Sequence, residues 1–259
     1  MISIYLINME KDVERLAHIT AQLNNLDLTA IRINAVNGKL LPDVDFDSYN
    51  NARISGSNKT WGKGNLGCFL SHRLTWETFS KSQENYCLII EDDVFLSPDL
   101  KLFLTSDAWI PKDADIVRLE TSTNRLKLGK SAVHHDRDIA KVLSTSWCAG
   151  AYLIKKDYAQ KLVALPPEKW STVDALMFEF ETSEVARNTS IYQVNPALAE
   201  QAKFKVEESG LSNFFFSNIE QPQQTKNTEQ KLKEFLKRVK KSNFLIKTVL
   251  GYKRIHFKE

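Results

Sequence analysis

An unbroken apolar run that ends in three consecutive carboxylates constrains the fold of this chain more than any other sequence feature. Residues 86–90 read Tyr-Cys-Leu-Ile-Ile, and Glu91, Asp92 and Asp93 follow directly. A continuous apolar run of this length is typical of a parallel strand that is buried on both faces of a sheet. Ligands of open α/β sheets bind at the carboxyl ends of such strands. The sequence therefore predicts a binding site at this strand end.

The three carboxylates would repel one another and lose hydration at a buried strand end, so a positive partner is expected there. A hard divalent cation that carries a phosphorylated substrate is the simplest such partner. It needs only one or two protein carboxylates, and it neutralises charge on a departing diphosphate. The alternative is an acidic strand end that only caps the following loop, and the local pattern leaves both interpretations open.

Strands and helices alternate through the first 165 residues, which predicts a mainly parallel, mixed α/β sheet flanked by helices. The predicted strands cover residues 2–7, 30–35, 86–90, 115–120, 149–154 and 190–194, and the predicted helices cover residues 12–25, 66–82, 98–109 and 157–165. Residues 41–63 are polar with little periodicity, which indicates a lid, a binding loop or disorder. A chain of 259 residues suits one large domain with an appendage.

Charge divides the chain into an acidic body and a basic tail. Residues 225–259 carry eleven Lys and Arg against three acids, whereas the other 224 residues carry 24 basic and 29 acidic side chains. Residues 221–230 predict a polar linker, and the tail after it predicts a lysine-rich amphipathic helix. Such a helix binds anionic lipid; a solvated helix packed on the body is the alternative. No nucleic-acid motif accompanies the tail, so an anionic membrane surface is the favoured partner.

The three cysteines and the chain start indicate a cytoplasmic protein. Cys68, Cys87 and Cys148 form no CxxC pattern and no even disulfide framework, which fits a reducing compartment. Residues 1–7 have strand length and no basic region, unlike a signal peptide. No apolar run reaches the roughly 18 residues that a membrane span requires. Together with the basic tail, this predicts a protein held peripherally on the inner face of a membrane.

Asp174 is a second candidate carboxylate, a lone acid that stands beside an apolar stretch after the Pro-Pro pair at residues 166–167. A partly desolvated carboxylate there suits a general base that deprotonates an acceptor hydroxyl. A helix N-cap is the alternative, and the local pattern alone favours it.

Other polar positions carry weaker signals. Residues 62–67 resemble a phosphate-cradling loop at a helix start, but no strand precedes them, which favours a flexible loop that leads into a helix. His72 lies within that helix and is expected to be a hydrogen-bonded structural residue. His134 and its neighbours lie in a polar stretch and are expected to be solvated. Arg118 and Glu120 project from one face of a strand, where they contact a substrate, or pair with each other or with neighbours.

Several segments, taken in order, resemble one known family. The main pair is Gly-Asn-Leu-Gly-Cys-Phe-Leu-Ser-His at residues 64–72 and Leu-Ile-Ile-Glu-Asp-Asp-Val at residues 88–94; residues 116–121, 165–168, 173–178 and 195–198 match further segments. This set is similar to glycosyltransferase family 25, the lipooligosaccharide galactosyltransferases of Gram-negative bacteria and their collagen-modifying relatives. The last four segments are most similar to the bacterial β-galactosyltransferases. The resemblance runs from residue 2 to about residue 205.

The resemblance implies a Rossmann-like fold of the GT-A type, in one domain of residues 1–220 followed by the linker and tail at 221–259. Within the domain it implies a donor half of about residues 1–125 and an acceptor half of about 126–220. The implied reaction is inverting transfer of a hexose, with UDP-galactose as the first donor to test, to a terminal sugar of lipooligosaccharide. Alternatives are a glucosyl- or N-acetylhexosaminyltransferase of the same fold, or a non-catalytic sugar-nucleotide-binding or glycan-binding relative.

The resemblance also implies roles for single residues. Asp93 is the expected ligand of Mn²⁺ or Mg²⁺ at the donor diphosphate, and Asp174 becomes the leading candidate for the base. Glu91 and Asp92 are placed nearer the ribose or a metal-bound water. The remaining expected donor contacts are Asn8, Arg15, Asn37, Ser71 and Arg118. Because the first strand ends in an Asn and not in a nucleophilic Asp, a metal-dependent phosphatase is disfavoured.

Two departures from the family pattern bear on specificity. Asn65 stands where family members commonly have Glu, and residues 147–152 carry one extra residue before Tyr152. The first departure leaves the donor and acceptor preference open. The second changes which side chain of that strand faces the site.

Overall fold

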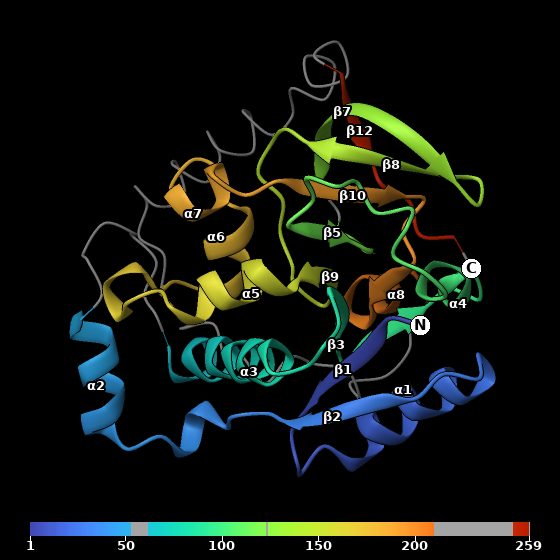
Figure 1. The fold of residues 1–259 in the computed structure, drawn as a ribbon. Helices are drawn as coiled ribbons and strands as arrows, with labels where there is room; N and C mark the ends of the chain where they lie inside the picture. The colour runs from blue at the N-terminus through green and yellow to red at the C-terminus, as the bar shows by residue number, and fades with distance from the viewer. Residues whose placement is uncertain (53–61, 123, 210–250, 259) are drawn as a thin grey trace.

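A nine-stranded mixed sheet forms the centre of the molecule (Figure 1). The structure, a computed structural model, describes residues 1–52, 62–122, 124–209 and 251–258. Across the sheet the strands run β12 (Tyr252–Arg254), β7 (Arg125–His134), β8 (Arg137–Val142), β10 (Ile191–Asn195), β5 (Ile116–Arg118), β9 (Ala151–Lys155), β3 (Tyr86–Glu91), β1 (Ser3–Asn8) and β2 (Ala30–Asn34). A smaller sheet contains β4 (Val94–Leu96), β11 (Ala199–Gln201) and β6 (Glu120–Thr121).

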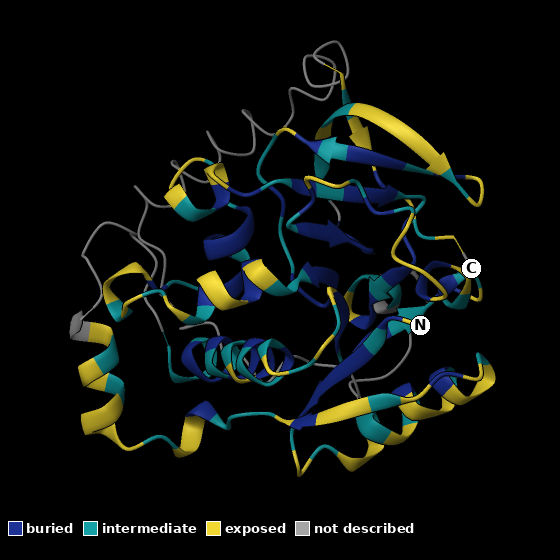
Figure 2. Cartoon of the chain, viewed as in Figure 1, coloured by how far each residue is buried: buried dark blue, intermediate teal, exposed yellow. Residues whose placement is uncertain are grey.

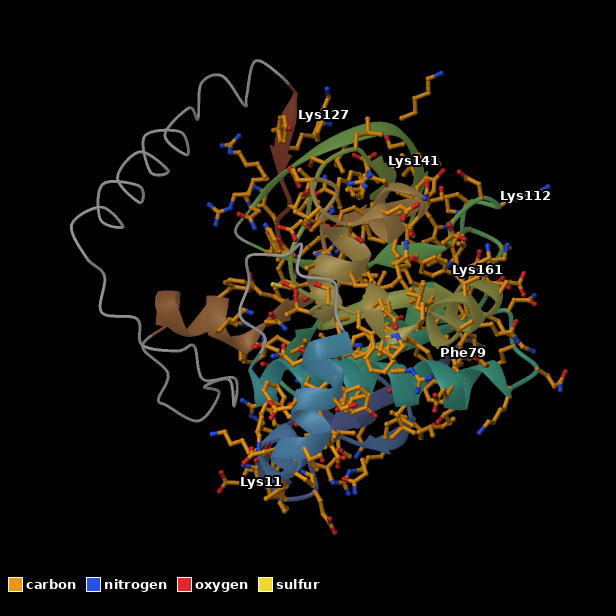
Figure 3. All side chains as sticks on the ribbon, turned by 90° about the vertical axis from the view of Figure 1, so that its left-hand side faces the viewer. Lys11, Phe79, Lys112, Lys127, Lys141 and Lys161 are labelled. Atoms are coloured by element: carbon orange, nitrogen blue, oxygen red, sulfur yellow. The ribbon has the colours of Figure 1, made fainter. Side chains whose placement is uncertain are left out.

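Helices pack around these sheets in the described part of the chain. They are α1 (Val13–Asn25), α2 (Asp43–Ala52), α3 (Lys63–Ser80), α4 (Leu100–Leu104), α5 (Lys156–Val163), α6 (Val173–Phe178), α7 (Glu184–Arg187) and α8 (Ala202–Ser209), with single 3-10 turns at η1 (Gly38–Leu40) and η2 (Pro167–Lys169). None of the helices that the structure describes combines the length and the apolar character needed to cross a bilayer. Lysines such as Lys112 and Lys161 point outward from the body (Figure 3).

Strand β3, the third strand from the β2 edge of the large sheet, confirms the strand predicted from the apolar run. Residues 87–90 are fully buried, and their side chains alternate between two cores (Figure 2). Cys87 and Ile89 pack with side chains of α3 on one face, and Leu88 and Ile90 pack with side chains of α1 and α4 on the other. β3 runs parallel to β1, so the carboxyl ends of both strands lie at the same edge of the sheet.

The prediction of a mainly parallel sheet was wrong. Three pairs of neighbouring strands are parallel (β1 with β2, β1 with β3, and β5 with β10), and the other five pairs are antiparallel. Two causes were hidden in the sequence. Strand β9 runs antiparallel between β3 and β5, and β7, the first strand of the β7–β8 hairpin, carries too many exposed polar residues to show as a strand. The hairpin turns at His135 and Asp136, both with positive φ, as a two-residue hairpin of this kind requires.

A helix occupies the start of the segment predicted as a loop at residues 41–63. Helix α2 has acidic residues in its first turn, which favour a helix start. The sequence does not predict this helix, because it has few apolar side chains, chiefly Phe46 and Tyr49, that pack on the core. Tyr49 stacks on Trp170 with ring centroids 5.2 Å apart, which fixes α2 against η2. Residues 53–61 lie outside the described part of the chain.

The end of the predicted helical tail is a strand. The helix and most of the linker predicted within residues 221–250 lie outside the described residues. Strand β12, however, pairs antiparallel with β7, and Ile255 is buried beside Leu126 and Ala197. The Thr121 hydroxyl donates a hydrogen bond to the carbonyl of Ile255 (2.6 Å). The tail therefore does not remain helical to residue 259, because its last residues complete the edge of the sheet.

Candidate active site

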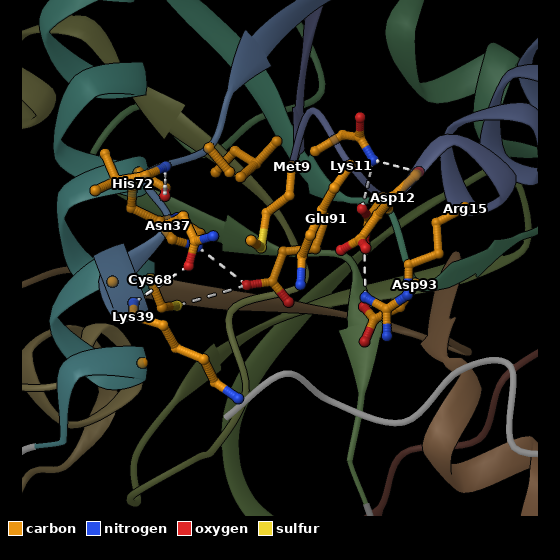
Figure 4. Close-up of a pocket in the computed structure, with 18 residues that line it drawn as sticks. Met9, Lys11, Asp12, Arg15, Asn37, Lys39, Cys68, His72, Glu91 and Asp93 are labelled. Atoms are coloured by element: carbon orange, nitrogen blue, oxygen red, sulfur yellow. Dashed lines mark hydrogen bonds and ion pairs between the residues drawn. The ribbon is translucent and has the colours of Figure 1, made fainter. Parts of the chain in front are cut away.

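A cleft opens at the edge of the sheet where β1 and β3 end, as the apolar run and its carboxylates predicted (Figure 4). Its walls come from the β1–α1 turn, the β2–η1 turn, the first turns of α3 and the acidic residues after β3. Lys11 and Lys39 line this cleft although the sequence did not single them out. Neither lysine lies in a recognisable motif, so only the fold reveals their position.

Two glycines bring the walls of the cleft together. A Cβ at Gly38 would lie 1.8 Å from the carbonyl oxygen of Lys63, and a Cβ at Gly67 would lie 2.5 Å from the backbone nitrogen of Gly38. The β2–η1 turn therefore packs directly on the α3 backbone. The side chain of Asn65, which replaces the family's usual acid, accepts a hydrogen bond from the Gly62 N–H (3.1 Å) and so caps the start of α3.

Ser71 and Asn37, both predicted to contact the donor, line the cleft but already have partners in the protein. The Ser71 hydroxyl donates to the carbonyl of Gly67 (2.7 Å) and accepts from the N–H of Val36 (2.8 Å). The Asn37 side chain accepts from the N–H of Lys39 (3.2 Å) and caps η1. The Ser71 hydroxyl therefore links the β2–η1 turn to α3, and the Asn37 side chain stabilises the turn itself.

Asp92 is held by two other predicted donor contacts. One carboxylate oxygen of Asp92 accepts from the Asn8 amide (2.7 Å), and the other pairs with Arg15 (3.0 Å). Burial raises the pKa of Asp92, although the bonds from Asn8 and Arg15 act in the opposite direction. Because both oxygens are used, Asp92 serves to fix the β1–α1 turn. The Asn8 oxygen Oδ1 stays buried without a partner among the described residues and lines the cleft.

Glu91 belongs to a hydrogen-bonded network that reaches into the core. His72 Nε2 lies 3.2 Å from Glu91 Oε1, and Gln201 donates to Oε2 (3.0 Å). His72 Nδ1 lies 2.8 Å from the Tyr152 hydroxyl, which also accepts from Trp76. Burial alone would raise the pKa of Glu91, but the bond and charge of His72 bring it below its ordinary value. His72 is hydrogen-bonded, as predicted, yet it also orients the acidic motif.

Asp93 differs from its two neighbours because one of its oxygens has no partner. Asp93 Oδ1 is buried and accepts no hydrogen bond within the described part of the chain. Burial, and next the charge of Glu91, raise the pKa of Asp93 to about 7. An unpaired hard oxygen beside a second carboxylate is the donor that Mn²⁺ or Mg²⁺ prefers. The residues present therefore fit the predicted cation at Asp93 and not at Asp92.

A second group of possible metal ligands lies next to Asp93. Cys68, His72 and Glu91 place one donor atom each within 4.8 Å of the others. Both ring nitrogens of His72 have protein partners, and burial raises the pKa of the Cys68 thiol well above its ordinary value. A metal would need the thiolate and a free ring nitrogen. The group is better described as the hydrogen-bonded support of Glu91.

Asp174 lines a second cavity together with the acidic strand end. This cavity shares Cys68, Glu91 and Asp93 with the cleft, and Lys203 is also among its lining residues. The N-cap of α6 is Thr172, so the alternative interpretation of Asp174 as the cap residue was wrong. Asp174 is the second residue of the helix, and its Oδ1 accepts from the N–H of Ala175 (2.9 Å). The structure thus brings the two predicted reactive carboxylates to one cavity.

Arg118 does not belong to this group, which corrects the prediction of a donor contact. Its side chain is buried and donates to the carbonyls of Trp147 (2.7 Å) and Cys148 (2.8 Å). Its guanidinium also lies 4.3 Å from the centre of the Phe178 ring. Arg118 therefore supports the wall of the second cavity from behind, where Cys148 adopts a positive φ of 74°. The alternating strand pattern predicted which face of the strand carries Arg118, but it did not show which residues cover that face.

Sequence comparison defines the class of the protein. Residues 1–177 match glycosyltransferase family 25, described as LPS biosynthesis protein. The match covers more than half of the chain, so the chain belongs to this family, which confirms the resemblance seen in its motifs. The protein is thus a glycosyltransferase by descent, and its cavity at the acidic strand end is the candidate active site.

Individual proteins of known name show the same similarity. The chain is 29% identical over 234 residues to lacto-N-neotetraose biosynthesis glycosyltransferase LgtB of Neisseria meningitidis serogroup B, covering 81% of this chain and 80% of that protein. It is 28% identical over 195 residues to lipooligosaccharide biosynthesis protein lex-1 of Haemophilus influenzae, covering 70% and 63%. Among solved structures, HddC from Yersinia pseudotuberculosis aligns with a TM-score of 0.37 and 13% identity over 74% of this chain and 89% of its own. That structural likeness is too slight to carry a conclusion.

Proposed function

We propose that this protein is an inverting hexosyltransferase of the GT-A type that transfers a sugar, galactose first among the candidates, from a UDP-sugar to a terminal sugar of lipooligosaccharide. The single observation that carries the proposal is the meeting of Asp93 and Asp174 at one cavity. Family membership supports the reaction class. The names of the relatives, which refer to lacto-N-neotetraose and lipooligosaccharide biosynthesis, support the acceptor.

The cleft beside Asp93 suits the nucleotide part of the donor. Its buried Asn8 oxygen Oδ1 needs a hydrogen-bond donor, which a ribose hydroxyl or a uracil N–H supplies. Lys11, from the β1–α1 turn, and Lys39, from η1, add positive charge to the cleft, which favours a diphosphate (Figure 4). The donor would therefore lie with its nucleotide toward β1 and its sugar toward the cavity that holds Asp174.

Asp93 would hold a divalent cation, Mn²⁺ or Mg²⁺, through its unpaired oxygen. When bound, such a cation acts as a Lewis acid that offsets charge on the departing diphosphate. Glu91 stands beside it as a second carboxylate whose position is fixed by His72 and Gln201. Asp92 contributes indirectly, because it keeps the β1–α1 turn in place through Asn8 and Arg15.

Asp174 would act as the general base. Its carboxylate accepts the proton of the acceptor hydroxyl while that oxygen bonds to the anomeric carbon of the donor sugar. The bond from the anomeric carbon to the phosphate oxygen breaks on the opposite face, and its electron pair leaves with UDP. Attack from the face opposite the leaving group inverts the anomeric configuration. The cavity that Asp174 shares with Asp93 provides the space between base and leaving group.

The basic tail is proposed to hold the enzyme peripherally at the anionic inner leaflet, where the acceptor is assembled. The argument is the excess of eight positive charges in residues 225–259. Because β12 is part of the sheet, the test should spare residues 251–259. Replacement of Lys231, Lys233, Lys237, Lys240 and Lys241 by Gln is expected to release the protein from anionic vesicles while transfer to a soluble acceptor continues. Unchanged sedimentation with such vesicles would refute the anchoring role.

A donor screen tests the reaction itself. Purified protein is incubated with Mn²⁺, a lactose- or glucose-terminated acceptor and, in turn, UDP-galactose, UDP-glucose and UDP-N-acetylhexosamines. Transfer from one donor is expected, and Asp93→Asn should remove it while the exposed Asp107→Asn control retains it. Binding of UDP without transfer across the acceptors would instead favour a non-catalytic relative. Full turnover by Asp93→Asn would reject the predicted role of Asp93.

A further inference from the structure

Lys203 brings a cation to the cavity between Asp93 and Asp174. Among the described residues that line this cavity, Lys203 carries the single positive side chain, whereas Glu91, Asp93 and Asp174 are carboxylates. Because Lys203 follows Asp93 by 110 residues, the local sequence does not show that the two residues line the same cavity. The cation therefore shares a cavity with both groups that the proposed reaction uses.

The backbone beside Lys203 is fastened to the acidic strand end. The N–H of Ala202 donates to the carbonyl of Asp93 (2.7 Å), and Gln201 lies opposite Val94 in the β11–β4 pair. The Gln201 side chain also donates to Glu91 (3.0 Å). These bonds place the start of α8 at a fixed distance from the acidic motif. The backbone of Lys203, the next residue, is therefore held beside the acidic motif, and its side chain lines the cavity from an exposed position.

Lys203 has no carboxylate partner of its own in the described part of the chain. Its ammonium forms no ion pair there, and its contact is with the neighbouring Phe204 ring, 5.0 Å from the ring centre. Arg15, by contrast, is paired with Asp92. Burial would lower the pKa of Lys203, but the electrostatic effect of Cys148 and of the carboxylates Glu91 and Asp93 raises it. Lys203 is thus a charged side chain available to an anion that enters the cavity.

We infer that Lys203 is a catalytic residue that binds the β-phosphate of the donor and stabilises it as a leaving group. The inference rests on the proposed function. As the bond between the anomeric carbon and the phosphate oxygen breaks, its electron pair adds one negative charge to UDP, and the Lys203 ammonium lies beside that charge. Lys203 keeps its proton throughout, while the acceptor proton goes to Asp174. A preorganised donor of this kind contributes on the order of 100-fold to 1,000-fold in rate.

The kinetic test compares Lys203→Gln with Lys205→Gln on the same helix. Lys205 contacts the Phe95 and Phe257 rings and does not line the cavity, so its variant is expected to transfer sugar at the wild-type rate. Lys203→Gln is expected to lower kcat about 100-fold with little change in the KM for the acceptor. Lys203→Arg should restore part of the rate, because a guanidinium also binds phosphate. Equal kcat values for Lys203→Gln and Lys205→Gln would overturn the inference.

A binding measurement separates this inference from the proposed reaction. Calorimetric titration with UDP and with uridine isolates the contribution of the phosphates. Lys203→Gln is expected to weaken UDP binding about tenfold and to leave uridine binding unchanged, whereas Lys205→Gln changes neither. UDP binding with this pattern but without transfer from any donor would reject the proposed reaction and retain the phosphate contact. An unchanged ratio of UDP to uridine affinity, or no UDP binding by the wild type, would overturn the contact itself.

Discussion

Asp92 and Asp93 are adjacent in sequence, yet the protein treats them in opposite ways. Asp92 has both oxygens engaged, one by Asn8 and one by Arg15. Asp93 has a buried oxygen without a partner in the described part of the chain, and its pKa is raised to about 7. Both side chains are nearly inaccessible to solvent. The two carboxylates are therefore similarly buried, and they differ in whether their oxygens have hydrogen-bond or ion-pair partners.

The difference shows that neighbouring carboxylates of one acidic motif can have separate roles, one structural and one in ligand binding. A carboxylate with all its bonds made stabilises the local framework, whereas a buried carboxylate with an open oxygen costs stability until a ligand arrives. On this argument Asp92 and its partners stabilise the folded state, whereas Asp93 and the cavity it lines serve the reaction. Substitutions on the two sides should then separate activity from stability, and the expected effects can be ranked.

The largest effect is expected at Asp174, on the functional side. Asp174→Asn removes the base but keeps a side chain of the same size that can still accept the hydrogen bond from Ala175. Because a positioned general base contributes roughly 100-fold to 10,000-fold, kcat for sugar transfer should fall by about 1,000-fold with little change in thermal stability. Asp157→Asn, an exposed acid in the first turn of α5, is the matched control. A kcat within about threefold of wild type would remove Asp174 from the reaction.

The next effect contrasts the two neighbouring carboxylates directly. Asp92→Ala leaves the Arg15 charge and the Asn8 amide without their partner, and should lower the free energy of unfolding by about 3 kcal/mol. Asp93→Ala removes a buried group that lacks a partner, and should leave stability within about 1 kcal/mol of wild type. Urea unfolding of both variants at pH 8 measures the difference. Equal losses in the two variants would refute the division between framework and function.

The strand that carries these acids could be predicted because its signal is local. An apolar run of strand length, followed by carboxylates, defines both the buried strand β3 and the location of the site at its end. The period of α1 and the length of α5 are encoded in the same way, by apolar residues that recur along one face. The apolar residues of such segments recur at regular intervals and are buried in the fold. Their secondary structure can therefore be predicted without knowing which segments pack against them.

The partners of polar residues could not be predicted, because they come from distant parts of the chain. Arg118 looked available for a substrate, but the backbone of residues 147–148 takes its donors. Gln201 reaches Glu91 across 110 residues, and β9 enters the sheet antiparallel after a hairpin whose first strand, β7, is partly exposed. Which oxygen remains unpaired is a property of the complete hydrogen-bond network. Sequence therefore located the candidate site, and the family resemblance named Asp93 as the metal ligand. Only the fold shows that Asp92 has both oxygens engaged, whereas Asp93 has a buried oxygen without a partner among the described residues.

The smallest effect concerns Glu120, a second carboxylate with an unpartnered oxygen, which is buried and does not line the cavity of Asp93 and Asp174. Its Oε1 accepts from the Gly150 N–H (2.8 Å), its Oε2 has no partner among the described residues, and burial raises its pKa to about 8. Between the ordinary pKa of a glutamate and pH 8, the folded state keeps a proton that the unfolded state releases. Stability from this group is thus complete at acidic pH and falls by about 1.4 kcal/mol per pH unit through that window.

Glu120→Gln should therefore flatten the pH dependence of the free energy of unfolding between about pH 5 and pH 8, since the amide does not titrate. The slope should diminish without vanishing, because Asp93 binds a proton over part of the same window. Urea unfolding at pH 5, 6.5 and 8 measures the slope, with the exposed Glu168→Gln as a control that keeps the wild-type dependence. Parallel curves for Glu120→Gln and wild type would mean that Glu120 is ionised in the fold. An ionised Glu120 would form a buried ion pair with Arg118, whose guanidinium nitrogen lies 3.9 Å from Glu120 Oε1.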